Sequence, residues 1–158
     1  VCATLWTDMN LRGNAPLDSI TAASIMNDYH RIRDDGYGKH WGRKLSPHMT
    51  MAFHRHSVNY IAEVLETPFD GPTVVVTHML PTEHAIHDMY KGSEATYNAF
   101  FASNLEWMMD RFEPAAWVFG HSHRSVDKTI FATRLLSNPR GYIHELNPDF
   151  NPGFVFEV

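Results

Sequence analysis

Residues 1–158 contain one cysteine, no long apolar run and no surplus of positive charge, and each shortage excludes a class of protein. The single thiol of Cys2 excludes an internal disulfide framework and fits a reducing compartment. No apolar stretch reaches the roughly 20 residues that a membrane-spanning helix needs. The formal net charge of −5 excludes a general electrostatic attraction to nucleic acid or to an anionic membrane. We therefore expect a cytoplasmic protein that forms one domain over 1–158.

Histidine, in contrast, is abundant. The sequence holds 11 histidines, roughly three times the share of an average protein, which makes metal binding a hypothesis to test. The chain also opens at Val1 with VCATLWTD, which reads as the interior of a strand. We therefore expect the sequence to begin in the middle of a domain.

The clearest predicted elements indicate an α/β fold with a mixed sheet. Ser46 is a suitable cap for a helix over 47–66, and Pro47 fits its first turn. The runs at 73–77 and 115–119 lack alternation, which is typical of buried strands, and the first is expected to be covered on both faces. A second helix over 94–112 is predicted to connect them. The predicted inward stripe of the first helix is Phe53, Ser57, Tyr60, Ile61 and Val64.

Weaker patterns complete the expected fold. The remaining predicted elements are a strand at 1–7, a helix from about Ser19 with Ile25, Tyr29 and Ile32 on one face, a solvated loop at 31–46, a hairpin through 126–137 and a closing strand at 154–158.

Two of these predicted strands are followed directly by a segment that contains histidine. The strand 73–77 is followed by His78, and the strand 115–119 is followed by Gly120, His121, Ser122 and His123. If the strands are parallel neighbours, all three imidazoles lie at the carboxyl edge of the sheet, where open α/β sheets form ligand sites. Gly120 is expected to let the backbone turn tightly there. Imidazole suits zinc, iron and other first-row metals.

The context makes this pattern specific. About 0.8 H-x-H matches are expected by chance in this composition, but a preceding glycine lowers the expectation to roughly 0.04. A second H-x-H, His54 to His56, lies inside the helix 47–66. Residues two apart on a helix point to nearly opposite sides, so we interpret that pair as solvated helix surface.

The two histidine segments also resemble a known family. VVVTH (74–78) and WVFGHSH (117–123) are similar to the last two metal motifs of the calcineurin-like metallophosphoesterases. LWTD (5–8), MNDYHRIR (26–33) and SNPRGY (137–142) resemble a bacterial branch of that family. The resemblance implies the αββα sandwich and a centre of two divalent ions (Mn, Fe, Zn or Mg). In that centre His78 and His121 would ligate one ion and His123 the other.

The earlier motifs of the family are absent. No Gly-Asp dipeptide occurs, and the only Gly-Asn, Gly13-Asn14, is followed by Ala15. Asp28-Tyr29-His30 spells D-x-H, but it lies in a predicted helix and a match by chance is expected, so we assign it no ligand role. The sequence therefore predicts the C-terminal part of an αββα enzyme. Its general acid and remaining ligands would belong to an N-terminal half, supplied in cis or in trans, and no catalytic residue is assigned here.

Three further residues are possible substrate contacts. His84 and His87 follow His78 in one loop, and Arg140 in NPRGY is suited to reach a phosphate. An exposed loop explains the two histidines equally well, and a turn explains the arginine.

The leading hypothesis is a metal-dependent phosphoesterase acting on a phosphomonoester or a phosphodiester. One alternative is a non-catalytic protein-binding module on the same fold. Another is a mononuclear zinc site made of His78, His121 and His123.

A half-domain is expected to leave a sheet edge and an apolar face uncovered. We therefore predict that residues 1–158 alone self-associate or dissolve poorly, which light scattering measures. A monodisperse monomer would contradict this prediction.

Overall fold

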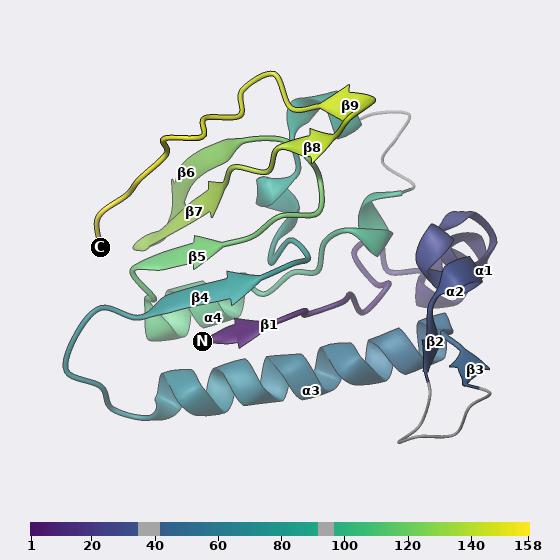
Figure 1. Ribbon diagram of the computed structural model, residues 1–158. Helices are drawn as coiled ribbons and strands as arrows, with labels where there is room; N and C mark the ends of the chain where they lie inside the picture. The colour runs from purple at the N-terminus through teal and green to yellow at the C-terminus, as the bar shows by residue number, and fades with distance from the viewer. Residues whose placement is uncertain (35–41, 92–96) are drawn as a thin grey trace.

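The computed structural model describes residues 1–34, 42–91 and 97–158. Its centre is a five-stranded sheet in the order β1-β4-β5-β7-β6 (Figure 1). The first four strands of that order are parallel, and β6 pairs antiparallel to β7. The mixed α/β architecture predicted from the sequence is thus confirmed. The strands are β1 (Cys2–Ala3), β4 (Val74–Thr77), β5 (Ala116–Val118), β6 (Val126–Ile130) and β7 (Thr133–Ser137).

Helices pack on one face of this sheet. Across β4, β5 and β7 the register aligns Val75, Trp117 and Leu135, which are fully buried. They share one core cluster with Ile61 of α3 (Pro47–Glu66) and with two methionines of α4 (Glu106–Phe112). Burial of this continuous apolar layer stabilises the sheet. The 3₁₀ turns η1 (Glu83–Ala85), η2 (Asp88–Tyr90) and η4 (Asn98–Phe100) lie in the connection between β4 and α4.

The opposite face of β4 is only partly covered. Val76 is 39% exposed, although its neighbour Val75 is completely buried. The prediction that this strand is covered on both faces is therefore wrong. The helices α3 and α4 bury the Val75 side, whereas the Val76 side is partly open to solvent.

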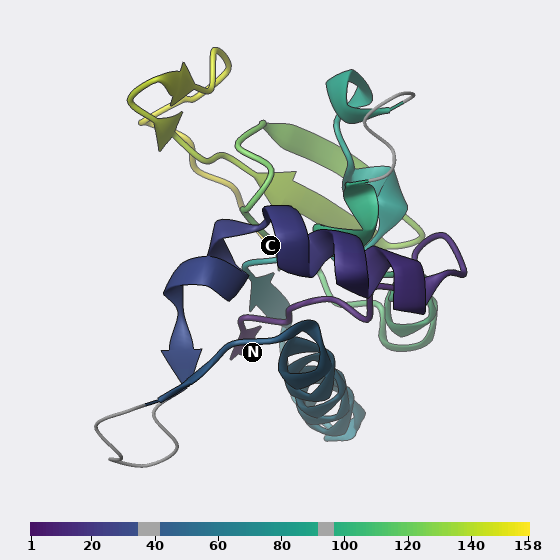
Figure 2. The ribbon, with the colours of Figure 1, turned by 90° about the vertical axis from the view of Figure 1, so that its right-hand side faces the viewer.

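Two short helices lie beyond the carboxyl ends of β4 and β5 (Figures 1 and 2). They are α1 (Ala15–Ile25) and α2 (Asn27–Arg31), separated by the extended backbone of Met26. This break interrupts the predicted periodicity, so Tyr29 is buried while Ile25 and Ile32 are exposed. Within the predicted loop 31–46, Arg31 ends α2, and β2 (Arg33–Asp34) and β3 (Arg43–Lys44) form an antiparallel pair; residues 35–41 fall outside the described residues.

The helix α3 has the predicted bounds but not the predicted inward face. Ser46 caps it by accepting a hydrogen bond from the Met49 amide, as expected. Ile61 is buried, yet Phe53, Tyr60 and Val64 are exposed. The buried residues are Met49, Thr50, His54 and Ile61.

His54 is thus a core residue rather than solvated surface, whereas His56 is exposed. The His54 Nδ1 lies 3.1 Å from the Leu5 carbonyl oxygen and 3.3 Å from that of Trp6, so the imidazole donates to this turn. Leu5 and Trp6 have left-handed φ values of 74° and 51°. The predicted strand at 1–7 therefore ends at Ala3, because the backbone turns to bring these carbonyls to α3.

Two other predicted elements are wrong. The helix over 94–112 is reduced to α4, because Leu80 pairs with 101–103 through Leu80 N–H to Phe101 O and Ser103 N–H to Leu80 O bonds. Residues 94–96 lie outside the described residues. The tail 154–158 forms no strand. It follows a turn in which Asn138 hydrogen-bonds both backbone groups of Asn151, and its Phe154 and Phe156 line a small cavity with residues of β5 and β7.

None of the helices in the described ranges 1–34, 42–91 and 97–158 combines the length and apolarity needed to cross a membrane.

The buried His54 predicts a pH-dependent stability. Burial lowers its pKa below 6.5, outweighing Asp8 and the two carbonyls. The unfolded chain therefore binds this proton first, and the free energy of unfolding falls as the pH drops below 6.5. His54→Asn replaces the imidazole N–H donor with an amide N–H that does not titrate. It is expected to reduce the slope of the unfolding free energy against pH by up to about 1.4 kcal/mol per pH unit, measured by urea unfolding from pH 7.5 to 4.5. The matched control is His56→Asn on the same helix, and an equal change in both variants would contradict the prediction.

Candidate functional site

The histidine segments follow two neighbouring parallel strands. The register pairs Val74 with Ala116 and Val76 with Val118, so β4 and β5 end at the same edge of the sheet. The Gly120 N–H donates to the His78 carbonyl oxygen at 3.1 Å, which joins the two strand-end loops. The predicted adjacency of these strands is confirmed.

His78 and His121 are in direct contact. The Nδ1 atom of His121 lies 3.1 Å from the Nε2 atom of His78, and one of the two imidazoles donates to the other. Their ring centroids are 5.0 Å apart and nearly perpendicular. On its other side, His121 packs against the Phe101 ring at 4.8 Å. The two imidazoles are therefore held together by strand pairing and by aromatic packing.

The turn after β5 is made by histidines rather than by glycine. His121 and His123 have left-handed φ values of 62° and 52°, whereas Gly120 does not lie in that region. The expectation that Gly120 makes the tight turn is therefore wrong. A non-glycine residue held in this conformation costs about 1–3 kcal/mol, and such strain gathers at functional sites.

Both paired histidines are uncharged near neutral pH. Burial lowers the pKa of His121 to about 3, with smaller contributions from His78 and His123. Burial also lowers the pKa of His78, and the negative charge of Asp28 opposes this shift. The Nε2 atom of His121 is buried and has no hydrogen-bond partner among the described residues. The neutral imidazole is the form that binds metal ions, through a nitrogen that carries no proton.

A cavity of about 410 Å³ opens at this edge, and all three predicted histidines line it. Two carboxylates line it as well. Asp28 reaches it from α2, and Glu145 lies there with its Oε2 atom 3.7 Å from the Nδ1 atom of His123. The pocket thus combines imidazole and carboxylate side chains from segments far apart in the chain.

Sequence reasoning missed both carboxylates. The sequence alone assigns Asp28 no ligand role, because its D-x-H motif is expected by chance and lies in a predicted helix. That helix is present as α2. Only the packing of α2 beyond the strand ends brings Asp28 to the pocket. The one signal in the sequence was the resemblance of MNDYHRIR to the bacterial phosphoesterases.

The hairpin of β8 (Gly141–Tyr142) and β9 (Glu145–Leu146) forms another wall. The Tyr142 ring lies 4.5 Å from the His123 ring, edge to face. Gly141 has φ +79°, and a Cβ atom there would lie 2.3 Å from the Glu145 carbonyl oxygen. Gly141 therefore allows β8 and β9 to approach closely, and the turn at Ile143 and His144 between them places Tyr142 and Glu145 at the site.

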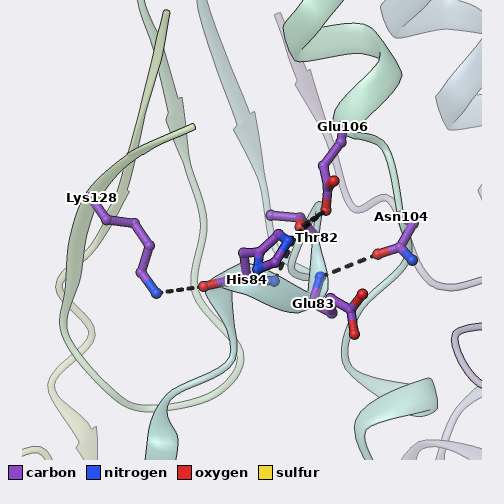
Figure 3. A network of polar contacts seen from close by, with 6 residues as sticks. All are labelled: Thr82, Glu83, His84, Asn104, Glu106 and Lys128. Carbon is purple, nitrogen blue, oxygen red and sulfur yellow. Dashed lines mark hydrogen bonds and ion pairs between the residues drawn. The ribbon is translucent and has the colours of Figure 1, made fainter. Parts of the chain in front are cut away.

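The three possible substrate contacts lie outside the pocket. The ring of His84 lies beside Glu106, at 3.7 Å from its Oε1 atom, in a network with Thr82 and Lys128 (Figure 3). His87 caps η2 by accepting a hydrogen bond from the Met89 amide. Arg140 is exposed, and its carbonyl accepts from the Asn147 amide.

The arrangement of the three histidines can be compared with that of a metal site. No group of three or more His, Cys, Asp or Glu side chains within 1–34, 42–91 and 97–158 is arranged to hold a metal ion. The pair of His78 and His121 fits as two ligands, because its nitrogens are 3.1 Å apart, close to the roughly 3.3 Å between two tetrahedral zinc ligands. The donor set is therefore compatible with a metal ion and incomplete in the described residues.

Comparisons with known proteins give one distant relative and no family. No family model matches the chain. The chain is 24% identical, over 161 aligned positions, to the uncharacterized protein L509 of Acanthamoeba polyphaga mimivirus. The match covers 99% of this chain and 54% of the viral protein, so the chain spans about half the length of that curated relative.

The geometry at Gly141 yields a stability prediction. Gly141→Ala is expected to lower the free energy of unfolding and to expose the amides of β8 and β9 to hydrogen exchange, because the new Cβ would meet the Glu145 carbonyl. Gly13→Ala is the matched control, since Gly13 has φ +73° but nothing within 4 Å of an added Cβ. The control is expected to cost about 1–2 kcal/mol from backbone strain alone. Equal losses in the two variants would contradict the clash at Gly141.

Proposed function

We propose that His78, His121 and His123 belong to the divalent-metal centre of a phosphoesterase that hydrolyses a phosphomonoester or a phosphodiester. The observation that carries the proposal is the contact of two neutral imidazoles at the carboxyl edge of parallel strands, beside a cavity of about 410 Å³. The resemblance of VVVTH and GHSH to phosphoesterase metal motifs gives the reaction class.

The chain's own residues have separate roles in this proposal. His78 and His121 would hold one ion through imidazole rings that burial keeps neutral. His123 would contribute to the second ion, with Glu145 orienting its imidazole from 3.7 Å. The chemistry that such ions supply is Lewis-acid activation of water and neutralisation of phosphoryl charge.

The absence of a three-ligand group among the described residues favours a second candidate. On this alternative the chain is a non-catalytic module that binds a protein partner. It predicts stoichiometric partner binding that a chelator leaves unchanged. The phosphoesterase proposal instead requires that the imidazole pair binds metal.

Metal titration tests the proposal directly. Isothermal titration of residues 1–158 with Mn²⁺ and Zn²⁺ at pH 7.5 is expected to give binding that His121→Ala and His78→Ala each weaken by at least about tenfold. The matched controls are His84→Ala and His56→Ala, because both histidines lie outside the pocket. Equal affinities of the His121 and His56 variants would overturn the proposal.

Hydrolysis of bis(4-nitrophenyl) phosphate is the second measurement. The metal-loaded chain 1–158 is expected to show no significant turnover, because its described residues offer an incomplete site. In a longer protein that carries this chain, His121→Ala is expected to abolish turnover and lower the metal content. Normal turnover in that variant would contradict the assignment.

A further inference from the structure

Aromatic rings form a continuous row that starts at the histidine pair. The ring of Phe101 lies 4.8 Å from that of His121, Phe100 lies 6.4 Å from Phe101, and Tyr97 lies 6.1 Å from Phe100. All of these rings line the same pocket. Phe100 is 1% exposed, whereas Tyr97 is 37% exposed, so the row is anchored in the core and ends at the surface.

The hairpin adds a second aromatic wall. Tyr142 lines the pocket and is held edge-on against His123 at 4.5 Å and stacked on His144 at 5.8 Å. These neighbours fix the direction of the ring, yet Tyr142 is still 60% exposed. Tyr90 also lines the pocket and is held in place because its hydroxyl donates to the Ser122 carbonyl in the GHSH turn. Rigid aromatic rings with free surface beside a polar site are the usual contacts of a planar ligand.

The two carboxylates restrict which polar and charged groups a bound aromatic ligand can carry. Asp28 and Glu145 line the pocket and, when ionised, act only as hydrogen-bond acceptors. A ligand with a second anionic group near them is repelled, and one with amino hydrogens is attracted. The walls therefore suit a ring that is neutral and carries hydrogen-bond donors, as nucleobases do.

We propose that this pocket takes a phosphoester whose alcohol carries a neutral planar aromatic ring, with Tyr142 and Tyr97 as the residues that determine this specificity. The proposal rests on the phosphoesterase function for the phosphate, and on the aromatic walls alone for the ring. The histidine pair marks the phosphate end of the pocket, and the exposed rings of Tyr97 and Tyr142 belong to its walls.

Three probes separate the ring from the phosphate. Adenosine 5′-monophosphate and ribose 5-phosphate differ only in the base, and adenosine lacks the phosphate. With Mn²⁺ present, the 158-residue chain is expected to bind the nucleotide about tenfold more tightly than ribose 5-phosphate, measured by isothermal titration, because stacking of one base on aromatic rings has this magnitude. Adenosine is expected to bind without metal.

Substitutions of Tyr142 and Tyr97 test whether the two aromatic walls cause the preference for the nucleotide. Tyr142→Ala is expected to weaken binding of the nucleotide more than binding of ribose 5-phosphate and so to bring the two affinities together, whereas a general loss of structure would weaken both equally. Tyr142→Phe is expected to retain the preference. Tyr97→Ala tests the other wall from a separate element. The matched control is Tyr60→Ala, since Tyr60 is an exposed tyrosine on α3 that does not line the pocket.

The outcomes distinguish the two proposals. Equal binding of the nucleotide and ribose 5-phosphate by the unmodified chain would overturn the aromatic specificity and leave the phosphoesterase proposal standing. An unchanged preference in both Tyr142→Ala and Tyr97→Ala would overturn it as well. Adenosine binding that Tyr142→Ala weakens, without metal-dependent binding of either phosphate ester, would support the aromatic walls and count against the phosphoesterase.

Discussion

The parallel pairing of β4 with β5 is the constraint on which the candidate site depends. Parallel strands end at the same edge, so the residues after Thr77 and after Phe119 meet there without any further folding event. The buried Trp117 indole donates to the Thr77 hydroxyl at 3.0 Å and locks the register from inside the core. The hydrogen bond from the Gly120 amide to the His78 carbonyl continues this alignment beyond the ends of the strands. A shift of this register would separate the two imidazoles.

Burial sets the chemistry of the pair. Transfer of an imidazolium ion into a poorly solvated site is unfavourable, so the neutral form of His78 and His121 is favoured. The opposing charge of Asp28 at the same pocket raises the pKa of His78 only in part. The pocket therefore combines neutral imidazoles with carboxylates and is a poor environment for an unneutralised phosphate.

The sequence allowed prediction wherever a local pattern determined the outcome. Helix α3 has the predicted bounds because Ser46 and Pro47 act locally on its first turn, and the histidines follow two strands that are apolar runs in the sequence. The predictions were wrong where a distant segment competed. Leu80 holds 101–103 extended and shortens α4, and the carbonyls of Leu5 and Trp6 draw His54 into the core. Asp28 was missed for the same reason, since α2 reaches the pocket only through tertiary packing.

The sequence by itself determined the α/β class and the order in which His78, His121 and His123 follow two strands. These properties follow from side-chain type and from spacing along neighbouring residues. Only the tertiary structure decided that Asp28, Tyr97, Tyr142 and Glu145 share the same pocket as those histidines. The positions of these four side chains depend on how α2, η4 and the β8–β9 hairpin pack beyond the strands. That packing depends on contacts between residues far apart in the chain, which no local pattern records.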